Sequence, residues 1–339
     1  MDALRYEQLQ FNAITENMSE GFLVIDDKNF VLSYNKSILD ILNIKEKDIH
    51  KLNILSVNRS LKFRKAVENV QKGVSTEDEI SFGGRTYMLL VNCVMQEEVI
   101  KGAVIMLLDI TEKHERDRLR REFSANVSHE LKTPLTSISG YAEIMKDGMV
   151  KPEDMTRFSD KIYVEAQRLI MLVEDIIKLS QLEEKGAEYT FETLDLYEIA
   201  ESVCDRLKIS AARKSVKIVL TGERAYIQGV KYIIDEMLFN ICENAVKYNI
   251  NGGNVLVDVE NNGLDKTVTV TDTGIGIPPE DKDRVFERFY RVDKSHSKET
   301  GGTGLGLSIV KHGAFIHNAK IELNSELGKG TKIKIIFNN

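Results

Sequence analysis

Residues 111–184 constrain the fold most, because they predict two long amphipathic helices in succession. A charged run from 111 to 122, without glycine or proline, leads into apolar residues that recur about once per helical turn: Leu119, Phe123, Val127, Leu131, Leu135 and Ile138. We expect one helix that runs to about Met145. Pro134 lies inside it and lacks a backbone donor, so it should kink or loosen the helix near residue 130.

A second helix is expected from about 153 to 184, after a break at 148–152. Its seam residues alternate spacings of four and three, which is a heptad pattern: Ile162, Ala166, Leu169, Val173, Ile176 and Ser180. Two such helices cannot enclose a core alone, so we expect a homodimer in which two hairpins form a four-helix bundle. Packing of the hairpin on another domain is the alternative.

The sequence on either side of this hairpin predicts a multidomain α+β protein. A chain of 339 residues has room for two or three domains. Residues 1–110 read as two strands, short helices and three strands, which is a small α/β domain. Residues 187–339 mix helical stretches with strands and predict an α/β sandwich. The helical hairpin is assigned to residues 111–186.

Composition excludes several kinds of partner and site. A net charge of −7 predicts no broad basic surface for nucleic acid. The three cysteines are far apart, which argues against a disulfide framework or a zinc site and fits a reducing cytosol. The longest wholly apolar run, 103–108, is far shorter than the ~20 residues of a membrane helix, so we expect no membrane span in this chain. The expected location is cytoplasmic, either as such or as the cytoplasmic portion of a cell-membrane sensor.

His129 is the first candidate for chemistry. The segment is not the zinc motif H-E-x-x-H, because Thr133 stands where the second histidine would be. His129 is out of phase with the apolar stripe, so its Nε2 should face solvent and can act as a nucleophile while Glu130 accepts the Nδ1 proton. Thr133, one turn on, could orient a water or a phosphoryl oxygen. Taken alone, an exposed histidine on a charged helix is more often ordinary surface.

Three polar side chains on one helix face mark a second candidate site. Asn240, Asn244 and Lys247 are spaced i, i+4 and i+7. Two amides and an ammonium group could serve a magnesium ion and phosphates. A plain polar face is the alternative, although asparagine is a poor helix former and its double use suggests a reason.

Two glycine-containing segments complete the set. Asp272 ends an alternating strand just before Gly274 and Gly276, so its carboxylate could bind a base edge where the backbone passes close. Residues 301–306 contain four glycines and open into a helix, whose free N–H groups suit phosphate oxygens. The loop is neither a P-loop nor a dinucleotide fingerprint. An ordinary turn is the alternative for Asp272.

In their order and spacing, these motifs resemble those of the two-component sensor histidine kinases. Residues 123–134 look like the H-box of that family, 240–248 the N-box, 272–277 the G1-box, 286–291 the F-box and 302–307 the G2-box. Residues 1–110 resemble a PAS sensor, and the chain is similar to the cytoplasmic part of phosphate-responsive sensor kinases. The resemblance implies a Bergerat-type ATP-binding domain after the dimerisation and histidine-phosphotransfer hairpin.

The same resemblance implies ATP and Mg²⁺ as cofactors and a response regulator receiver domain as partner. His129 would accept the phosphoryl group and pass it to an aspartate of that partner, with Asn244 as the Mg²⁺ ligand. Further implied nucleotide contacts are Asp272 at the adenine amino group, Arg291 at the γ-phosphate, and Asn240, Lys247, Tyr248, Gly274, Gly276, Arg288, Gly302, Thr303, Gly304, Leu305 and Gly306.

Two other functions compete with phosphotransfer. Fold-related ATPases generally carry a glutamate one turn before the Mg²⁺ ligand, where this chain has Asn240, so the γ-phosphoryl group should wait for His129 instead of being hydrolysed. A non-catalytic scaffold is disfavoured by the intact Asn244, Asp272 and glycine loops. Glu130 and Thr133 also imply a reverse activity, dephosphorylation of the response regulator.

Overall fold

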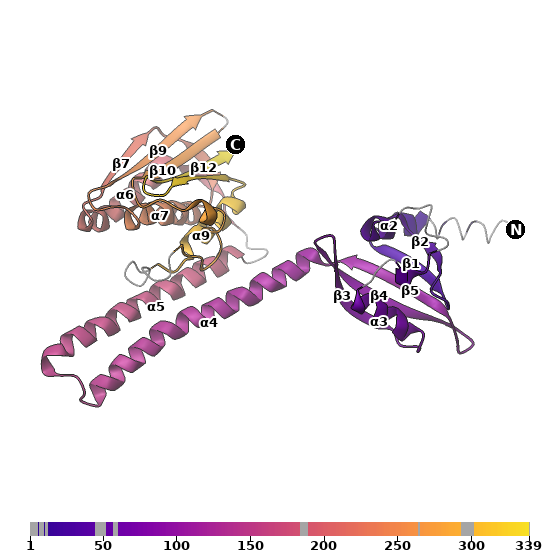
Figure 1. Ribbon diagram of the computed structural model, residues 1–339. Helices are drawn as coiled ribbons and strands as arrows, with labels where there is room; N and C mark the ends of the chain where they lie inside the picture. The colour runs from indigo at the N-terminus through magenta and orange to yellow at the C-terminus, as the bar shows by residue number, and fades with distance from the viewer. Residues whose placement is uncertain are drawn as a thin grey trace. The chain divides into compact units, whose positions relative to one another are not determined.

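The computed structural model divides into two compact units, Met1–Ser124 and Ala125–Asn339 (Figure 1). It describes residues 6, 10, 13–44, 52–56, 60–183, 189–263, 265–292 and 302–338. The boundary expected at 186/187 lies outside these residues. Among the described helices, none is both long enough and apolar enough to cross a membrane.

The first unit is built on one antiparallel sheet of five strands in the order β2-β1-β5-β4-β3. The strands are β1 (Gly21–Asp26), β2 (Val31–Tyr34), β3 (Thr76–Phe82), β4 (Arg85–Gln96) and β5 (Val99–Asp109), and helices α2 (Lys36–Leu42) and α3 (Leu61–Val70) lie between β2 and β3 in the chain. The expected order of two strands, short helices and three strands is confirmed. Alternate residues of β1, among them Leu23 and Ile25, are buried in one core with Phe63 of α3.

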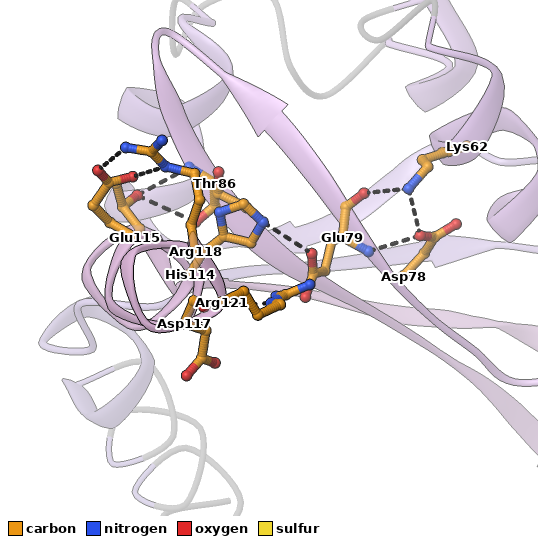
Figure 2. Close-up of polar contacts among 10 residues, drawn as sticks. Lys62, Asp78, Glu79, Thr86, His114, Glu115, Asp117, Arg118 and Arg121 are labelled. Atoms are coloured by element: carbon orange, nitrogen blue, oxygen red, sulfur yellow. Dashed lines mark hydrogen bonds and ion pairs between the residues drawn. The ribbon is translucent and has the colours of Figure 1, made fainter. Parts of the chain in front are cut away.

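Helix α4 (Thr111–Lys146) begins directly after β5 and is fixed to the sheet by polar contacts. Asp109 Oδ1 accepts hydrogen bonds from the backbone N–H and the hydroxyl of Thr111, at 2.9 and 2.6 Å. The Thr111 hydroxyl oxygen also accepts from the Thr86 N–H at 2.9 Å. One turn further, His114 Nε2 lies 3.7 Å from the Glu79 carboxylate on β3 (Figure 2). The first turn of α4 therefore has a defined direction relative to this sheet.

Helices α4 and α5 (Met155–Glu183) run antiparallel and form the expected hairpin (Figure 1). Helix α4 is one continuous element through Pro134, whose ring is buried. Near the tip, Tyr141 of α4 packs edge-on against Phe158 of α5, with 5.6 Å between ring centroids. The buried residues of α5 are Leu172, Leu179 and Leu182, none of which belongs to the predicted heptad seam.

The C-terminal part is an α/β sandwich, as expected. Its sheet has the order β11-β12-β10-β9-β7, and three helices cover one face (Figure 1). The strands are β7 (Lys217–Gly222), β9 (Asn254–Asn262), β10 (Asp265–Asp272), β11 (Lys320–Glu326) and β12 (Gly330–Asn338); the helices are α6 (Leu196–Arg213), α7 (Lys231–Lys247) and α9 (Gly306–Ile316). Strands β7 and β9 are parallel and the other pairs antiparallel. A separate pair, β6 (Glu192–Asp195) and β8 (Tyr226–Gly229), was not predicted.

Replacing Gly222 at the end of β7 by alanine should destabilise this sandwich. Gly222 has a φ of 104°, and an added Cβ would lie 2.0 Å from the Val259 carbonyl oxygen on β9, so the two strands would have to separate. We expect the free energy of unfolding to fall by about 3 kcal/mol, measured by urea denaturation. Gly252→Ala is the control, because Gly252 has a φ of 79° but nothing within 4 Å of the added Cβ. It should cost about 1 kcal/mol, and equal losses would contradict the argument.

Candidate functional site

His129 lies on α4 with its side chain exposed, as the apolar phase of the helix predicts. The hydroxyl of Thr133, one turn later, donates a hydrogen bond to the His129 carbonyl oxygen at 3.1 Å. Glu130 follows His129 directly and is half-buried. An accessible ring nitrogen with a carboxylate beside it can act as a nucleophile with its own proton acceptor.

The Glu130 carboxylate is paired with a residue that the sequence did not single out. Arg168 of α5 places Nη2 3.6 Å from Glu130 Oε2, and its side chain is only 17 % exposed. Arg291 is close to the same pair. Burial lowers the pKa of the Arg291 guanidinium, the nearby Tyr248 and Glu130 raise it, and the positive charge of Arg168 lowers it further.

The three polar residues of α7 are in different environments. Asn240 is buried, and its amide donates to the Glu236 backbone oxygen at 2.8 Å and to Glu236 Oε1 at 3.1 Å. Lys178 of α5 binds the same Glu236 oxygen at 2.8 Å. Asn244 and Lys247 are half-buried. Asn244 and Lys247 are thus the more accessible members of this helix face.

Lys247 lies against the glycine-rich loop. A Cβ added to Gly302 would be 2.6 Å from Lys247 Nζ and 3.2 Å from the Tyr248 hydroxyl, so a side chain at this position would displace the end of Lys247. Gly306 is equally close to α7, because its added Cβ would lie 2.5 Å from Asn240 Oδ1. Burial lowers the pKa of the Lys247 ammonium to about 8, despite the nearby Glu243 carboxylate.

Asp272 ends β10 and is held by two backbone donors. Its Oδ1 accepts from Gly274 N at 2.8 Å and from Thr331 N at 3.2 Å. Burial raises the pKa of this carboxyl, and the two hydrogen bonds counteract the rise. The adjoining turn is tight: an added Cβ at Gly274 would lie 2.4 Å from the Tyr248 carbonyl oxygen. The end of α7 and the end of β10 therefore meet at one place.

The remaining predicted residues lie along α5 and the start of α9. Thr303 donates from Oγ1 to Asp175 Oδ2 of α5 at 2.6 Å. Arg288 forms an ion pair with Glu183 at the end of α5. Gly304 has a φ of 74° and accepts a hydrogen bond from Phe289 N at 2.9 Å, which joins this loop to the segment that carries Arg288 and Arg291.

Two family models match this chain. The family model "His Kinase A (phospho-acceptor) domain" matches residues 119–185, and "Histidine kinase-, DNA gyrase B-, and HSP90-like ATPase" matches 229–339. The sensor protein kinase WalK of Staphylococcus aureus is 31 % identical over 336 residues, which is 97 % of this chain and 80 % of that protein. The chain belongs to the sensor histidine kinases. The sensor histidine kinase WalK of Bacillus subtilis (strain 168) is also 31 % identical, and the chain spans 55 % of its length.

Solved structures agree on the fold of the kinase. A crystal structure of the histidine kinase ThkA, in complex with the response regulator protein TrrA, matches 96 % of this chain and 97 % of that chain, with a TM-score of 0.53 and 21 % identity. The histidine kinase AdeS of Acinetobacter baumannii matches 62 % of this chain with a TM-score of 0.51 and 25 % identity. The arrangement of hairpin and α/β sandwich is therefore a histidine kinase fold. The two family models and the WalK relatives show that the kinase is ATP-dependent.

Sequence reasoning missed the side chains of α5 that reach the kinase's predicted site residues. Arg168, Asp175 and Glu183 contact Glu130, Thr303 and Arg288 respectively. Each pair is separated by 38 or more positions, so no local spacing indicates it. The only signal available was the presence of these charges on a helix expected to carry an apolar seam.

ATP affinity of the kinase should fall as the pH rises from 7 to 9. Lys247 is a predicted phosphate contact with a pKa of about 8, so its ammonium group loses the proton in this range and its expected attraction to phosphate is lost. We expect binding to weaken by up to about tenfold if only the protonated form binds. Calorimetry with a non-hydrolysable ATP analogue at constant ionic strength measures this. Lys247→Arg stays charged and should bind with a nearly constant affinity; identical pH profiles would contradict the assignment.

Proposed function

We propose that the kinase transfers the γ-phosphoryl group of ATP to His129 and then to an aspartate of a response regulator receiver domain. The observation that carries this is an exposed His129 with Glu130 beside it on α4, in a chain whose sandwich gathers Lys247, Asp272 and the glycine loop at one place. His129 Nε2 forms the bond to phosphorus, and the bond from phosphorus to the oxygen of ADP breaks. Glu130 takes the Nδ1 proton.

Asp272 suits the adenine end of the nucleotide. Both of these backbone hydrogen bonds reach Oδ1, which restrains the carboxylate and leaves Oδ2 for a donor such as the adenine amino group. Because Gly274 and Gly276 have no side chains, a flat base can approach the backbone closely here. Gly276 has a φ of 70° and lies against the Glu326 carbonyl oxygen.

Lys247, Arg291 and the loop from Gly302 to Gly306 suit the phosphates. The loop opens into the N-terminus of α9, whose first N–H groups have no partner within the helix, and Lys247 supplies positive charge beside it. Among the described residues, no group of three or more His, Cys, Asp and Glu could hold a metal ion. By the family resemblance, Mg²⁺ would be held by the Asn244 amide oxygen together with phosphates and water, and it would neutralise charge on the leaving phosphates.

The surroundings of Asn240 favour a kinase over an ATPase. Asn240 cannot act as a general base, and Glu236, one turn earlier, is bound by both Lys178 and the Asn240 amide. A carboxylate engaged in this way is poorly placed to activate water. The γ-phosphoryl group would thus remain available for His129.

The hairpin favours a homodimer, because several of its apolar side chains are exposed to solvent in the single chain. Those at least 39 % exposed include Leu135, Ile144, Tyr163, Val164, Ile170, Val173 and Ile177. Exposed apolar side chains on two paired helices are what a four-helix bundle buries. We assign the sensor role to the first unit, a PAS-like domain, with the start of α4 as its output.

His129→Gln should abolish labelling by ATP that carries a radioactive γ-phosphate. In the wild type the label should be acid-labile and base-stable, as expected of a phosphorus–nitrogen bond. His114→Gln is the matched control, because His114 is another histidine on α4 and should keep the label at about the wild-type level within twofold. Retention of the label in His129→Gln would contradict the assignment of the acceptor. Steady phosphate release without any label would favour the ATPase.

Thr133→Ala should slow dephosphorylation of the phosphorylated response regulator by roughly tenfold or more, because the hydroxyl that orients the attacking water is lost. Autophosphorylation should change by less than about threefold. Thr136→Ala is a close control, since the Thr136 hydroxyl also donates to a carbonyl one turn back, that of Lys132 at 2.8 Å. Unchanged dephosphorylation in Thr133→Ala would rule out a phosphatase role for this residue.

A further inference from the structure

Within the described residues, Arg168 is the one residue of α5 that forms an ion pair with the predicted acceptor turn of α4. Its Nη2 lies 3.6 Å from Glu130 Oε2, and its side chain is 17 % exposed while that of Glu130 is 39 % exposed. A guanidinium group stays charged at all physiological pH values. Because most of Arg168 is withdrawn from water, releasing Glu130 would leave a desolvated charge without its counterion. Breaking this ion pair should therefore cost more free energy than breaking an ordinary surface ion pair.

The Glu130 carboxylate must be held in one orientation to accept the proton of His129. Consecutive residues on a helix do not face each other, so Glu130 does not point toward the ring of its neighbour by helix geometry alone. A half-exposed glutamate also has many accessible rotamers. An ion pair through Oε2 restricts these rotamers and leaves Oε1 available as a proton acceptor.

Arg291 cannot replace Arg168 in this role. The charges of Glu130 and Arg168 both shift the pKa of Arg291, so the three groups are neighbours. Arg291, however, also lies near Tyr248 of the ATP-binding sandwich. Arg168 and Glu130 both belong to the helical hairpin, so their contact does not depend on where the ATP-binding sandwich lies. The hairpin thus carries its own counterion for Glu130.

We propose that Arg168 is a positioning residue for phosphotransfer, which holds the Glu130 carboxylate in the orientation that accepts the His129 proton. This rests on the proposed role of Glu130. Arg168 acts through Glu130 and does not bind the nucleotide. Its loss should therefore slow the chemical step and leave the binding of ATP unchanged.

The test is the initial rate of His129 labelling by the whole chain at varied ATP. Arg168→Gln should lower kcat about tenfold with KM for ATP unchanged. Arg168→Lys keeps the charge without the planar fork and should recover part of the rate. Arg157→Gln is the matched control, because Arg157 is also on α5 and forms an ion pair at the same distance, 3.6 Å, with Asp154. Its rate should equal that of the wild type.

A double-mutant cycle decides whether Arg168 acts through Glu130. Glu130→Gln should lower kcat, and adding Arg168→Gln to it should cause no further loss. An equal further loss in the Glu130→Gln background would overturn the proposal, as would a wild-type kcat in Arg168→Gln. If Glu130→Gln itself had a wild-type kcat, the proposed proton acceptor would be wrong and the positioning role would fail with it. A raised KM for ATP in Arg168→Gln would indicate a nucleotide contact instead.

Discussion

The close approach of the glycine-rich start of α9 to α7 is the contact on which the proposed nucleotide site depends. A Cβ added at Gly302 would lie 2.6 Å from Lys247 Nζ, and one added at Gly306 would lie 2.5 Å from Asn240 Oδ1, so a side chain at either position would displace one of these two polar groups. The same closeness removes water from Lys247 and lowers the pKa of its ammonium group to about 8. A desolvated cation beside free backbone N–H groups attracts a phosphate more strongly than a solvated one would.

Helix α5 connects the phosphoacceptor hairpin to this site through three acidic or basic residues. Asp175 binds Thr303, Lys178 binds Glu236, and Glu183 binds Arg288 and lies 3.4 Å from His312 Nε2. Burial raises the pKa of the Asp175 carboxyl, and its hydrogen bond from Thr303 opposes the rise. Since Thr303 and Arg288 are also predicted nucleotide contacts, a nucleotide that uses them must compete with α5.

Much of this architecture follows from periodicity, and the parts that do not follow have a physical reason. The long helices and the strands of both sheets were predictable, because their apolar residues alternate or recur over many positions. The β6–β8 pair was not, because its strands have four residues each and are joined across 30 positions. The contact between Arg168 and Glu130 was equally hidden, since it depends on how two helices face each other. The glycines of the nucleotide site, by contrast, were visible as an unusual cluster.

In the turn that carries His129, the Thr133 hydroxyl has two possible roles: a hydrogen bond to the backbone and a contact with water. Pro134 has no backbone N–H, so the Glu130 carbonyl oxygen loses the donor that would normally reach it from four residues on. Just beside this break, the Thr133 hydroxyl donates to the His129 carbonyl oxygen at 3.1 Å. Threonine can leave that bond by changing χ1, because two rotamers are accessible to it in a helix. One hydroxyl can therefore support the helix in one rotamer and face a water molecule in the other, which valine of the same shape could not do.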